Sequence, residues 1–343
     1  MRILIPSVQT PFIKGGAFYL IEGLFRALTL RGYEAEIVTL PFKFFPEHYV
    51  SDIMDMWSRL DFNNFNGYES DLAIVLQFPA YYVKHNNKVL WLMHQHRAVY
   101  DLHDLNNEPA VEAKELKTKI TKYDNEILSK IPLRYTISKN VSNRLLRFNK
   151  ISSMPLYHPP SGENLFYCEE PYDFIFYPSR LEKLKRQDIL IEAMKYVKSP
   201  VKALIAGTGG QVESYNMLIE KYDLKDKVKL TGLLSEKEKY AFYARSLAVF
   251  FGPLDEDYGY VTLEAMLSSK PVITCIDSGG PLEFIEDKQN GFVIEPEPAV
   301  LAEIIDFLYY NKNKAKDIGR YARESYIKKN ISWNNVIDLL LKF

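Results

Sequence analysis

Residues 252–274, GPLDEDYGYVTLEAMLSSKPVIT, decide the fold of this chain. The apolar run 247–251 before them predicts a strand buried on both faces, as in a parallel sheet. An acidic turn follows, and the next run predicts a helix that ends before Pro271, after which VITCI predicts another strand. Strand, turn, helix and strand together form one repeating unit of a parallel α/β sheet.

Two carboxylates, Glu256 and Glu264, flank Gly259 at the predicted helix start. Backbone N–H groups at a helix N-terminus favour a phosphate, and a glycine there permits a tight turn or a close ligand. Glu264 is placed to accept hydrogen bonds from two ribose hydroxyls, and Glu256 lies where a second sugar would sit. The arrangement suits a ligand with a diphosphate in its middle. The alternative is that both glutamates are ordinary surface acids.

The run E-D-Y-G-Y-V-T-L-E, residues 256–264, resembles the E-x7-E signature of retaining glycosyltransferases of family four, which have the GT-B fold. The family more often has Phe-Gly-Leu where this chain has Tyr-Gly-Tyr. The resemblance implies that Glu256 is catalytic. It also implies donor contacts from Tyr258, Gly259, Tyr260, Val261 and Glu264.

Composition indicates a folded protein of two domains, since the chain has 343 residues, of which 47% are hydrophobic and 25% charged. A formal charge of −1 gives no overall field that would attract nucleic acid. No apolar stretch reaches membrane-spanning length, and MRILIPSVQTP predicts a core strand rather than a signal peptide. Cys168 and Cys275 are expected to be reduced core thiols, which predicts a cytoplasmic protein.

Strands and helices alternate along both halves, which predicts two doubly wound parallel sheets. The expected strands are 2–8, 34–40, 71–78, 88–96, 133–138, 173–179, 201–207, 227–232, 247–251, 272–276 and 291–296. The expected helices are 15–32, 46–60, 112–130, 139–148, 187–197, 213–222 and 236–246, with three helical runs after 296. Ser235 and Glu238 have the spacing of a capping box for the helix that follows them.

Prolines and polar residues interrupt this alternation at 151–171, which predicts a linker. The predicted organisation is a Rossmann-like acceptor domain over 1–160, a Rossmann-like nucleotide-sugar domain over 171–325 and a last segment over 326–343. The resemblance implies that the two sheets face a central cleft and that the last helix crosses back to the first domain.

When a nucleotide sugar is cleaved, negative charge develops on the leaving diphosphate. Positive charge fixed nearby is expected to make the largest contribution to lowering the barrier. Arg180, at a strand end, and Lys185, at the start of the next helix, supply it at the carboxyl edge of the second sheet. The stretch resembles the family's R-L-x-x-x-K segment, in which both residues hold the diphosphate. A solvated basic turn is the alternative, and it is the expected role of the neighbouring Lys183 and Arg186.

Two glycine turns also follow predicted strands. Gly15 and Gly16 resemble the family's N-terminal Gly-Gly loop, and Gly207 and Gly209 resemble its glycine turn beside the donor. Neither turn has the G-x-G-x-x-G spacing of a dinucleotide site. Further expected donor contacts are the backbone at Leu233 and Leu234, and Glu283.

His94 and His96 end a predicted strand, so alternation places both on one face. They resemble the family's first-domain histidine, which faces the donor sugar, and His96 is the closer match. A structural role and a zinc site with His103 and Asp104 are the alternatives. Arg97 is a candidate contact to phosphate or acceptor.

No metal site or cofactor is expected. The string Asp255-Glu256-Asp257 has the D-x-D form that binds a cation in glycosyltransferases of the other common fold, GT-A. It lies deep in the second half of the chain, and Arg180 with Lys185 makes a metal redundant.

The sequence therefore predicts a retaining glycosyltransferase that moves a sugar from a UDP or GDP sugar to a saccharide or lipid-linked acceptor, in cell-surface polysaccharide or glycan synthesis. A GT-B-fold sugar-nucleotide epimerase and a non-catalytic sugar-nucleotide-binding subunit are the alternatives. Residues 42–49, FKFFPEHY, and 144–150, RLLRFNK, mix basic and aromatic residues, which keeps open a peripheral contact with the inner face of the membrane.

Overall fold

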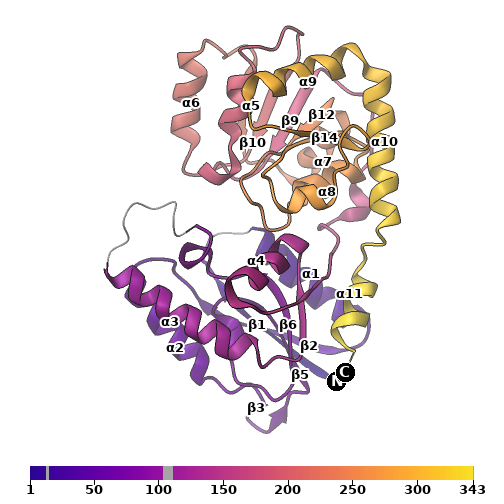
Figure 1. The fold of residues 1–343 in the computed structure, drawn as a ribbon. Helices are drawn as coiled ribbons and strands as arrows, with labels where there is room; N and C mark the ends of the chain where they lie inside the picture. The colour runs from indigo at the N-terminus through magenta and orange to yellow at the C-terminus, as the bar shows by residue number, and fades with distance from the viewer. Residues whose placement is uncertain (13–14, 103–110, 343) are drawn as a thin grey trace. The chain divides into compact units, whose positions relative to one another are not determined.

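The computed structural model describes residues 1–12, 15–102 and 111–342. The chain divides into two compact units, Met1–Ser161 with Ser332–Phe343, and Gly162–Ile331. Each unit is built on a six-stranded sheet whose paired strands all run parallel, with helices packed against it (Figure 1). The predicted α/β class with two parallel sheets is confirmed. Each strand and helix expected from the sequence is present, with ends that shift by a few residues.

The first unit has a sheet of strand order β2-β1-β5-β6-β7-β8. Its strands are β1 (Arg2–Gln9), β2 (Glu34–Pro41), β5 (Leu72–Gln77), β6 (Lys88–His94), β7 (Leu133–Thr136) and β8 (Met154–Pro155). Its helices are α1 (Gly16–Leu30), α2 (Glu47–Arg59), α3 (Val111–Leu128), α4 (Lys139–Asn149) and α11 (Trp333–Leu340). The short strands β3 (Asn64–Phe65) and β4 (Tyr68–Glu69) pair antiparallel outside this sheet. Every residue of β5 is buried, as expected of a central strand covered on both faces.

Part of the predicted linker 151–171 is built into the first sheet. Met154 pairs with Tyr135 of β7, and the indole N–H of Trp91 donates to the carbonyl of Leu156 over 3.1 Å. The linker prediction is therefore wrong for residues 154–156. The apolar residues of this segment add an edge strand, which the surrounding prolines conceal in the sequence.

The last helix, α11, belongs to the first unit, although the second unit precedes it in the chain. Trp333 packs so closely on α1 that a Cβ added at Gly23 would overlap its ring. Arg31 at the end of α1 forms an ion pair of 2.5 Å with Asp338. Gly23 thus has a packing role, because only a residue without a side chain lets the indole approach the helix.

The second unit has a sheet of strand order β11-β10-β9-β12-β13-β14. Its strands are β9 (Phe174–Pro178), β10 (Lys202–Ala206), β11 (Val228–Gly232), β12 (Ala248–Phe250), β13 (Val272–Cys275) and β14 (Gly291–Ile294). Its helices are α5 (Gln187–Ala193), α6 (Val212–Lys221), α7 (Glu236–Arg245), α8 (Tyr260–Leu267), α9 (Pro298–Tyr310) and α10 (Lys312–Lys328).

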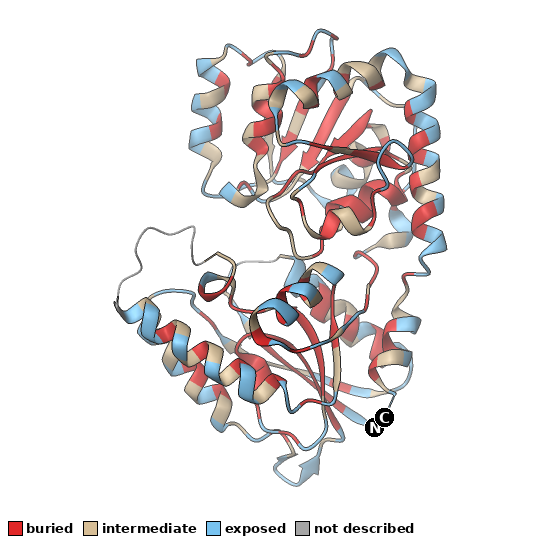
Figure 2. Ribbon diagram, in the orientation of Figure 1, coloured by how far each residue is buried: buried red, intermediate tan, exposed pale blue. Residues whose placement is uncertain are grey.

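Burial separates the inside of each unit from its outside. The central strands of both sheets are buried, and the outer faces of the helices are exposed (Figure 2). The capping box at the start of α7 is confirmed, since Ser235 Oγ accepts from the N–H of Glu238 and the Glu238 carboxylate accepts from the N–H of Ser235. Both cysteines are free, but Cys168 is exposed while Cys275 is buried. The expectation of two core thiols is therefore wrong for Cys168.

Among the helices of the described residues, none is both long and apolar enough to cross a bilayer.

Candidate active site

The predicted donor residues of the second unit lie at the carboxyl ends of its strands, which we call the carboxyl edge of the sheet. Arg180 follows β9, Leu233 and Leu234 follow β11, and Glu256 follows β12. Because the strands are parallel, their carboxyl ends share this edge, where open α/β sheets bind ligands. Leu233 is largely exposed there. Glu283 lies in the short 3-10 helix Gly280–Glu283 after β13, on the same side.

The glycine turn after β10 is held against the strand end that carries Arg180. A Cβ added at Gly207 would overlap the carbonyl oxygen of Ser179, and one added at Gly209 would overlap that of Leu181. Both glycines have positive φ angles, 135° and 158°, which other residues rarely adopt. The N–H of Leu181 donates to the carbonyl of Thr208 over 2.9 Å. These glycines therefore bring two loops of the edge into backbone contact.

Lys185 and Glu256 form an ion pair. Their side chains are 16% and 23% exposed, so the pair is largely sheltered from solvent. The N–H of Glu256 donates to the carbonyl of Ser278 over 2.9 Å, and its carbonyl accepts from the N–H of Gly280 over 2.8 Å. The structure thus brings together one predicted cation and one predicted acid, on loops 71 residues apart in the chain.

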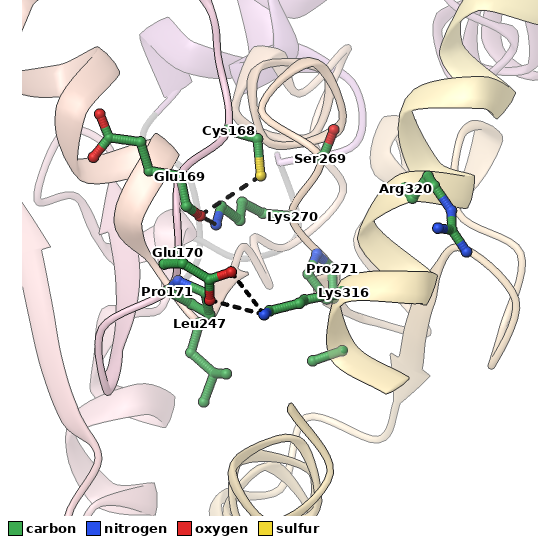
Figure 3. A pocket seen from close by; sticks show the side chains of 11 residues that line it. Cys168, Glu169, Glu170, Pro171, Leu247, Ser269, Lys270, Pro271, Lys316 and Arg320 are labelled. Carbon is green, nitrogen blue, oxygen red and sulfur yellow. Dashed lines mark hydrogen bonds and ion pairs between the residues drawn. The ribbon is translucent and has the colours of Figure 1, made fainter. Parts of the chain in front are cut away.

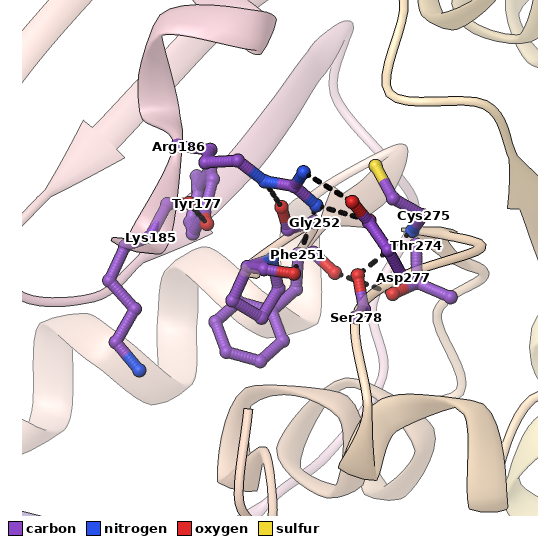
Figure 4. Close-up of polar contacts among 10 residues, drawn as sticks. Tyr177, Lys185, Arg186, Phe251, Gly252, Thr274, Cys275, Asp277 and Ser278 are labelled. Carbon is purple, nitrogen blue, oxygen red and sulfur yellow. Dashed lines mark hydrogen bonds and ion pairs between the residues drawn. The ribbon is translucent and has the colours of Figure 1, made fainter. Parts of the chain in front are cut away.

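Arg186 anchors the loops around that pair (Figure 4). Its two terminal nitrogens donate to the carboxylate of Asp277 over 2.8 and 2.6 Å. Its other bonds reach the carbonyls of Gly252, over 2.8 Å, and Pro253, over 3.0 Å. The expectation that Arg186 belongs to a solvated basic turn is therefore wrong. The neighbouring Lys183 is exposed, as expected.

Arg180 is exposed, and its carbonyl accepts from the side chain of the fully buried Gln187 over 2.9 Å. This bond fixes the backbone at Arg180 and leaves its long side chain at the sheet edge.

Gly259 is the residue immediately before α8 and has a left-handed conformation, with φ +87° and ψ +61°. A Cβ there would lie 2.9 Å from Cγ of Pro281, so the position requires glycine for both space and backbone angle. Tyr258 beside it is buried, with its ring 5.7 Å from that of Phe284 and 5.3 Å from that of Tyr260. The first turn of α8, with the buried Val261, therefore starts at the edge as predicted.

Glu264, one turn into α8, is buried and faces α7. The hydroxyl of Tyr243 donates to its Oε2 over 2.6 Å, and Lys239 Nζ lies 3.3 Å from its Oε1. Burial, and then the charge of Glu264, raises the pKa of Tyr243, so this hydroxyl stays protonated and donates. Glu264 is not the solvated surface acid of the alternative interpretation.

In the first unit, Gly15 precedes α1 and Gly16 is its first residue. A Cβ added at Gly15 would meet no atom of the described chain within 4 Å, so the turn is open on that side.

The two histidines do not share one strand face. Strand β6 ends at His94, whose Nδ1 lies 2.7 Å from the carbonyl of Gln95. His96 lies beyond the strand end, with φ −72° and ψ 85°, so the alternation argument is wrong for it. Its ring packs 4.9 Å from Phe78 and stacks on Phe44 at 6.5 Å. Burial, with the nearby His94, lowers the pKa of His96 to about 4, so its ring is neutral near pH 7.

Arg97 begins a 3-10 turn and forms an ion pair with Asp101 at 2.5 Å. The buried Arg144 also contacts Asp101, at 3.5 Å. His103 and Asp104, the remaining members of the zinc alternative, lie outside the described residues. Among residues 1–12, 15–102 and 111–342, no three His, Cys, Asp or Glu side chains are grouped to hold a metal ion.

A buried polar cluster in the first unit has no counterpart in the sequence analysis. Asp124 is fully buried and accepts from the hydroxyls of Tyr81, Tyr82 and Tyr100 over 2.8, 2.6 and 2.7 Å. Burial raises the pKa of Asp124 to about 6, although the three hydroxyls oppose this shift. Tyr100 also accepts from Asn149, which bonds to Gln95, the residue between the two histidines. In the sequence, Asp124 is an acid in an amphipathic helix. Most acids in such helices are exposed to solvent, so this pattern did not predict a buried carboxylate.

A cavity of about 400 Å³ lies at the amino ends of the strands of the second sheet, before β12 and β13 (Figure 3). Its buried cation, Lys270, donates to the carbonyl of Glu169 over 3.0 Å, and Lys316 pairs with Glu170 at 2.8 Å. Since these cations already have partners and the glycine turns lie at the opposite edge, the cavity is separate from the candidate site.

Residues 168–325 match the family model described as glycosyl transferases group 1. The chain is 31% identical to the human alpha-1,3/1,6-mannosyltransferase ALG2 over 144 residues, which is 37% of this chain and 34% of ALG2. It is 34% identical over 155 residues to the poly(ribitol-phosphate) alpha-N-acetylglucosaminyltransferase of Staphylococcus aureus (strain COL), covering 44% of this chain and 31% of that protein. The chain thus spans about a third of the length of these two curated relatives.

Solved structures share the fold over nearly the whole chain. The sucrose-phosphate synthase of Thermosynechococcus elongatus aligns with a TM-score of 0.78 at 16% identity, over 99% of this chain and 96% of that one. HepE of Anabaena, solved with UDP and glucose, aligns with a TM-score of 0.71 at 18% identity, over 98% and 97% of the two chains. The predicted GT-B architecture is therefore confirmed, and residues 168–325 are similar to the glycosyl transferases group 1 family.

Proposed function

We propose that this protein transfers a sugar from a nucleotide-sugar donor to a saccharide or lipid-linked acceptor with retention of anomeric configuration. The observation that supports it most is the edge of the second sheet. There Lys185 and Glu256 are in contact, Arg180 is exposed, and α8 begins directly after Gly259. A diphosphate bound there meets two cations and the amino end of a helix.

The chemistry follows from where charge develops. When the bond to the donor sugar breaks, negative charge grows on the leaving diphosphate, and fixed positive charge from Arg180 and Lys185 stabilises it. The leaving phosphate oxygen takes the proton of the attacking acceptor hydroxyl on the same face of the sugar, so the configuration is retained. Glu256 binds hydroxyls of the transferred sugar, and Glu264 binds those of the ribose.

Two cations at the diphosphate also support metal-independent transfer. The D-x-D string of residues 255–257 is held by backbone bonds, since the N–H groups of Asp255 and Glu256 donate to the carbonyls of Asp277 and Ser278. Glu256 is paired with Lys185. We therefore propose that the string supplies Glu256 to a site with two cations and does not bind a metal ion.

The donor that we propose is a UDP or GDP sugar, and two curated relatives of this chain are named as a mannosyltransferase and an N-acetylglucosaminyltransferase. The open glycine turn at Gly15, with His96 and Arg97, is proposed to contribute contacts from the first unit. A neutral His96 suits a hydrogen bond to a sugar hydroxyl.

Two exposed aromatic rings support a lipid-linked acceptor, and with it a contact on the inner face of the membrane, in cell-surface glycan synthesis. Phe44 and Phe45 are 61% and 72% exposed in the segment after β2, beside the basic Lys43. Aromatic rings next to a cation suit the interface of an anionic bilayer.

Incubation with UDP and GDP sugars, with and without total bacterial lipid extract and glycan acceptors, tests the proposal. We expect release of the nucleoside diphosphate that depends on acceptor, with an α-linked product from an α-linked donor. Formation of an epimer without acceptor indicates an epimerase. Donor binding with no turnover on any acceptor indicates a non-catalytic sugar-nucleotide-binding subunit. Either of these outcomes contradicts the proposal.

A further inference from the structure

We propose that Lys239 is a positioning residue for the donor nucleotide, which orients the Glu264 carboxylate to bind the two vicinal hydroxyls of a ribose. This inference rests on the proposed function and adds to it a residue that no part of the E-x7-E signature contains.

The geometry around Glu264 gives each carboxylate oxygen one partner. Tyr243 donates to Oε2 over 2.6 Å, and Lys239 lies 3.3 Å from Oε1. Both partners come from α7, at positions four residues apart, so they lie on the same face of that helix. The carboxylate is therefore fixed in one plane by two donors from one rigid element.

A carboxylate has about four lone-pair sites, two on each oxygen. The two contacts from α7 use one site on each oxygen and leave one on each. A vicinal diol presents two O–H donors side by side, which matches this pair of remaining sites. The Glu264 side chain keeps 12% of its surface exposed, so it is largely buried but still accessible to a ligand.

The charge of Lys239 is secured by a second acid. Its Nζ lies 3.1 Å from Oε2 of Glu236, so the ammonium bridges two carboxylates. Burial lowers the pKa of Lys239, but Glu264 and Glu236 outweigh this and hold it above its ordinary value. The ring of Tyr240 lies 5.4 Å from the same nitrogen. Lys239 is therefore a cation near pH 7.

Without this cation, the buried Glu264 would keep only the Tyr243 hydroxyl as partner. A carboxylate in a sheltered site with one donor is poorly compensated and can rotate to find others. Its two remaining lone-pair sites would then no longer face the ribose together. The loss should therefore fall on ligands that have the diol, which a purely structural link between α7 and α8 does not predict.

The test measures dissociation constants by calorimetry for UDP, GDP and their 2′,3′-dideoxy counterparts, with wild type, Lys239→Met, Lys239→Arg and Tyr243→Phe. Lys237→Met is the control, because Lys237 is an exposed lysine of the same helix. We expect Lys239→Met to weaken binding of the preferred ribonucleotide about tenfold and that of its dideoxy form less than twofold. Lys239→Arg restores most of the affinity, and Lys237→Met binds as wild type does.

Tyr243→Phe keeps the inference testable if Lys239→Met does not fold, since it removes one hydroxyl from the other carboxylate oxygen and should show the same dependence on the diol. An equal loss for ribo and dideoxy ligands, or no loss for either, overturns the role of Lys239 and leaves the proposed function intact. If wild type binds neither UDP nor GDP, both the role of Lys239 and the proposed donor are wrong.

Discussion

The guanidinium of Arg186 and the carboxylate of Asp277 form a two-bond ion pair that joins the loops on either side of the candidate site. Arg186 follows Lys185 directly, and Asp277 precedes Ser278, whose carbonyl accepts from the N–H of Glu256. The Arg186–Asp277 pair therefore sets the separation at which Lys185 meets Glu256.

Replacing Arg186 by glycine should lower both stability and turnover. Glycine suits the left-handed backbone at this position, where φ is 52°, so the change removes the side chain without adding strain. We expect the free energy of unfolding to fall by about 2 kcal/mol, because Asp277 and two carbonyls lose their partner. Denaturant unfolding and the turnover number measure the two effects.

The control for this change is Lys183→Gly, since Lys183 is exposed in the same turn. Lys183→Gly should lower the free energy of unfolding by less than about 1 kcal/mol. Equal losses in the two variants would show that the turn, and not the Arg186–Asp277 pair, is what matters.

Gly207→Ala should disorganise the donor edge. The added Cβ would overlap the carbonyl of Ser179, and φ of +135° is strained for alanine. We expect a loss of more than about 2 kcal/mol in unfolding free energy and weaker donor binding, as the Arg180 loop is displaced. Gly210→Ala is the matched control, because a Cβ there meets no described atom within 4 Å. Calorimetric melting of both variants that shows no difference would contradict this account of the glycine turn.

The buried Asp124 should make stability depend on pH. Its pKa is raised to about 6 in the folded protein from an ordinary value of 3.8. The folded state therefore holds this proton more tightly than the unfolded state. The stability that results is fully present below about pH 3.8 and is lost as pH rises through about pH 6.

Asp124→Asn removes that proton equilibrium and isolates its contribution. Between pH 4 and pH 7 the wild type should lose more unfolding free energy than the variant, by roughly 2 kcal/mol for a pKa raised from 3.8 to about 6. Parallel stability curves for the two proteins, from denaturant titrations at each pH, would show that Asp124 does not titrate in this range.

Exposed phenylalanines should matter for a lipid-linked acceptor and not for a soluble one. Phe44→Ser with Phe45→Ser should reduce sedimentation with vesicles of mixed neutral and anionic lipid several-fold, because two aromatic rings are lost from the interface. Leu165→Ser changes an exposed apolar residue of the other unit and is the control. Binding to vesicles that is the same in all three proteins would remove the support for a membrane contact at this segment.

The sequence predicted those features that depend on local pattern. Strand–helix alternation predicted both parallel sheets, and the spacing of Ser235 and Glu238 predicted the cap of α7. Gly259 was predicted at a tight turn or a close ligand contact before the helix, and the structure has it there in a left-handed conformation. Each of these is decided by residues within one turn or one strand of each other.

Features that depend on distant residues were missed. Asp277, the partner of Arg186, lies 91 positions away in the chain. The sequence around Arg186 is a run of basic residues, and it gave no sign that the Arg186 side chain is largely sheltered by this ion pair. The strand containing His94 stops before His96, because the chain turns there into a 3-10 helix that apolar alternation does not reveal. The three tyrosines around Asp124 meet it only through the packing of α3 on the loops after β5 and β6.

We propose that the carboxyl edge of the second sheet binds the diphosphate of a nucleotide sugar through Arg180 and Lys185, beside Glu256. Calorimetric binding of UDP, GDP and ADP sugars to wild type, Lys185→Ala and Arg180→Ala, with Lys183→Ala as control, tests this binding site. We predict that wild type and Lys183→Ala bind one nucleotide class with equal affinity, and that each of the other variants binds it at least about tenfold more weakly while melting cooperatively. Unchanged affinity in both Lys185→Ala and Arg180→Ala would contradict the claim.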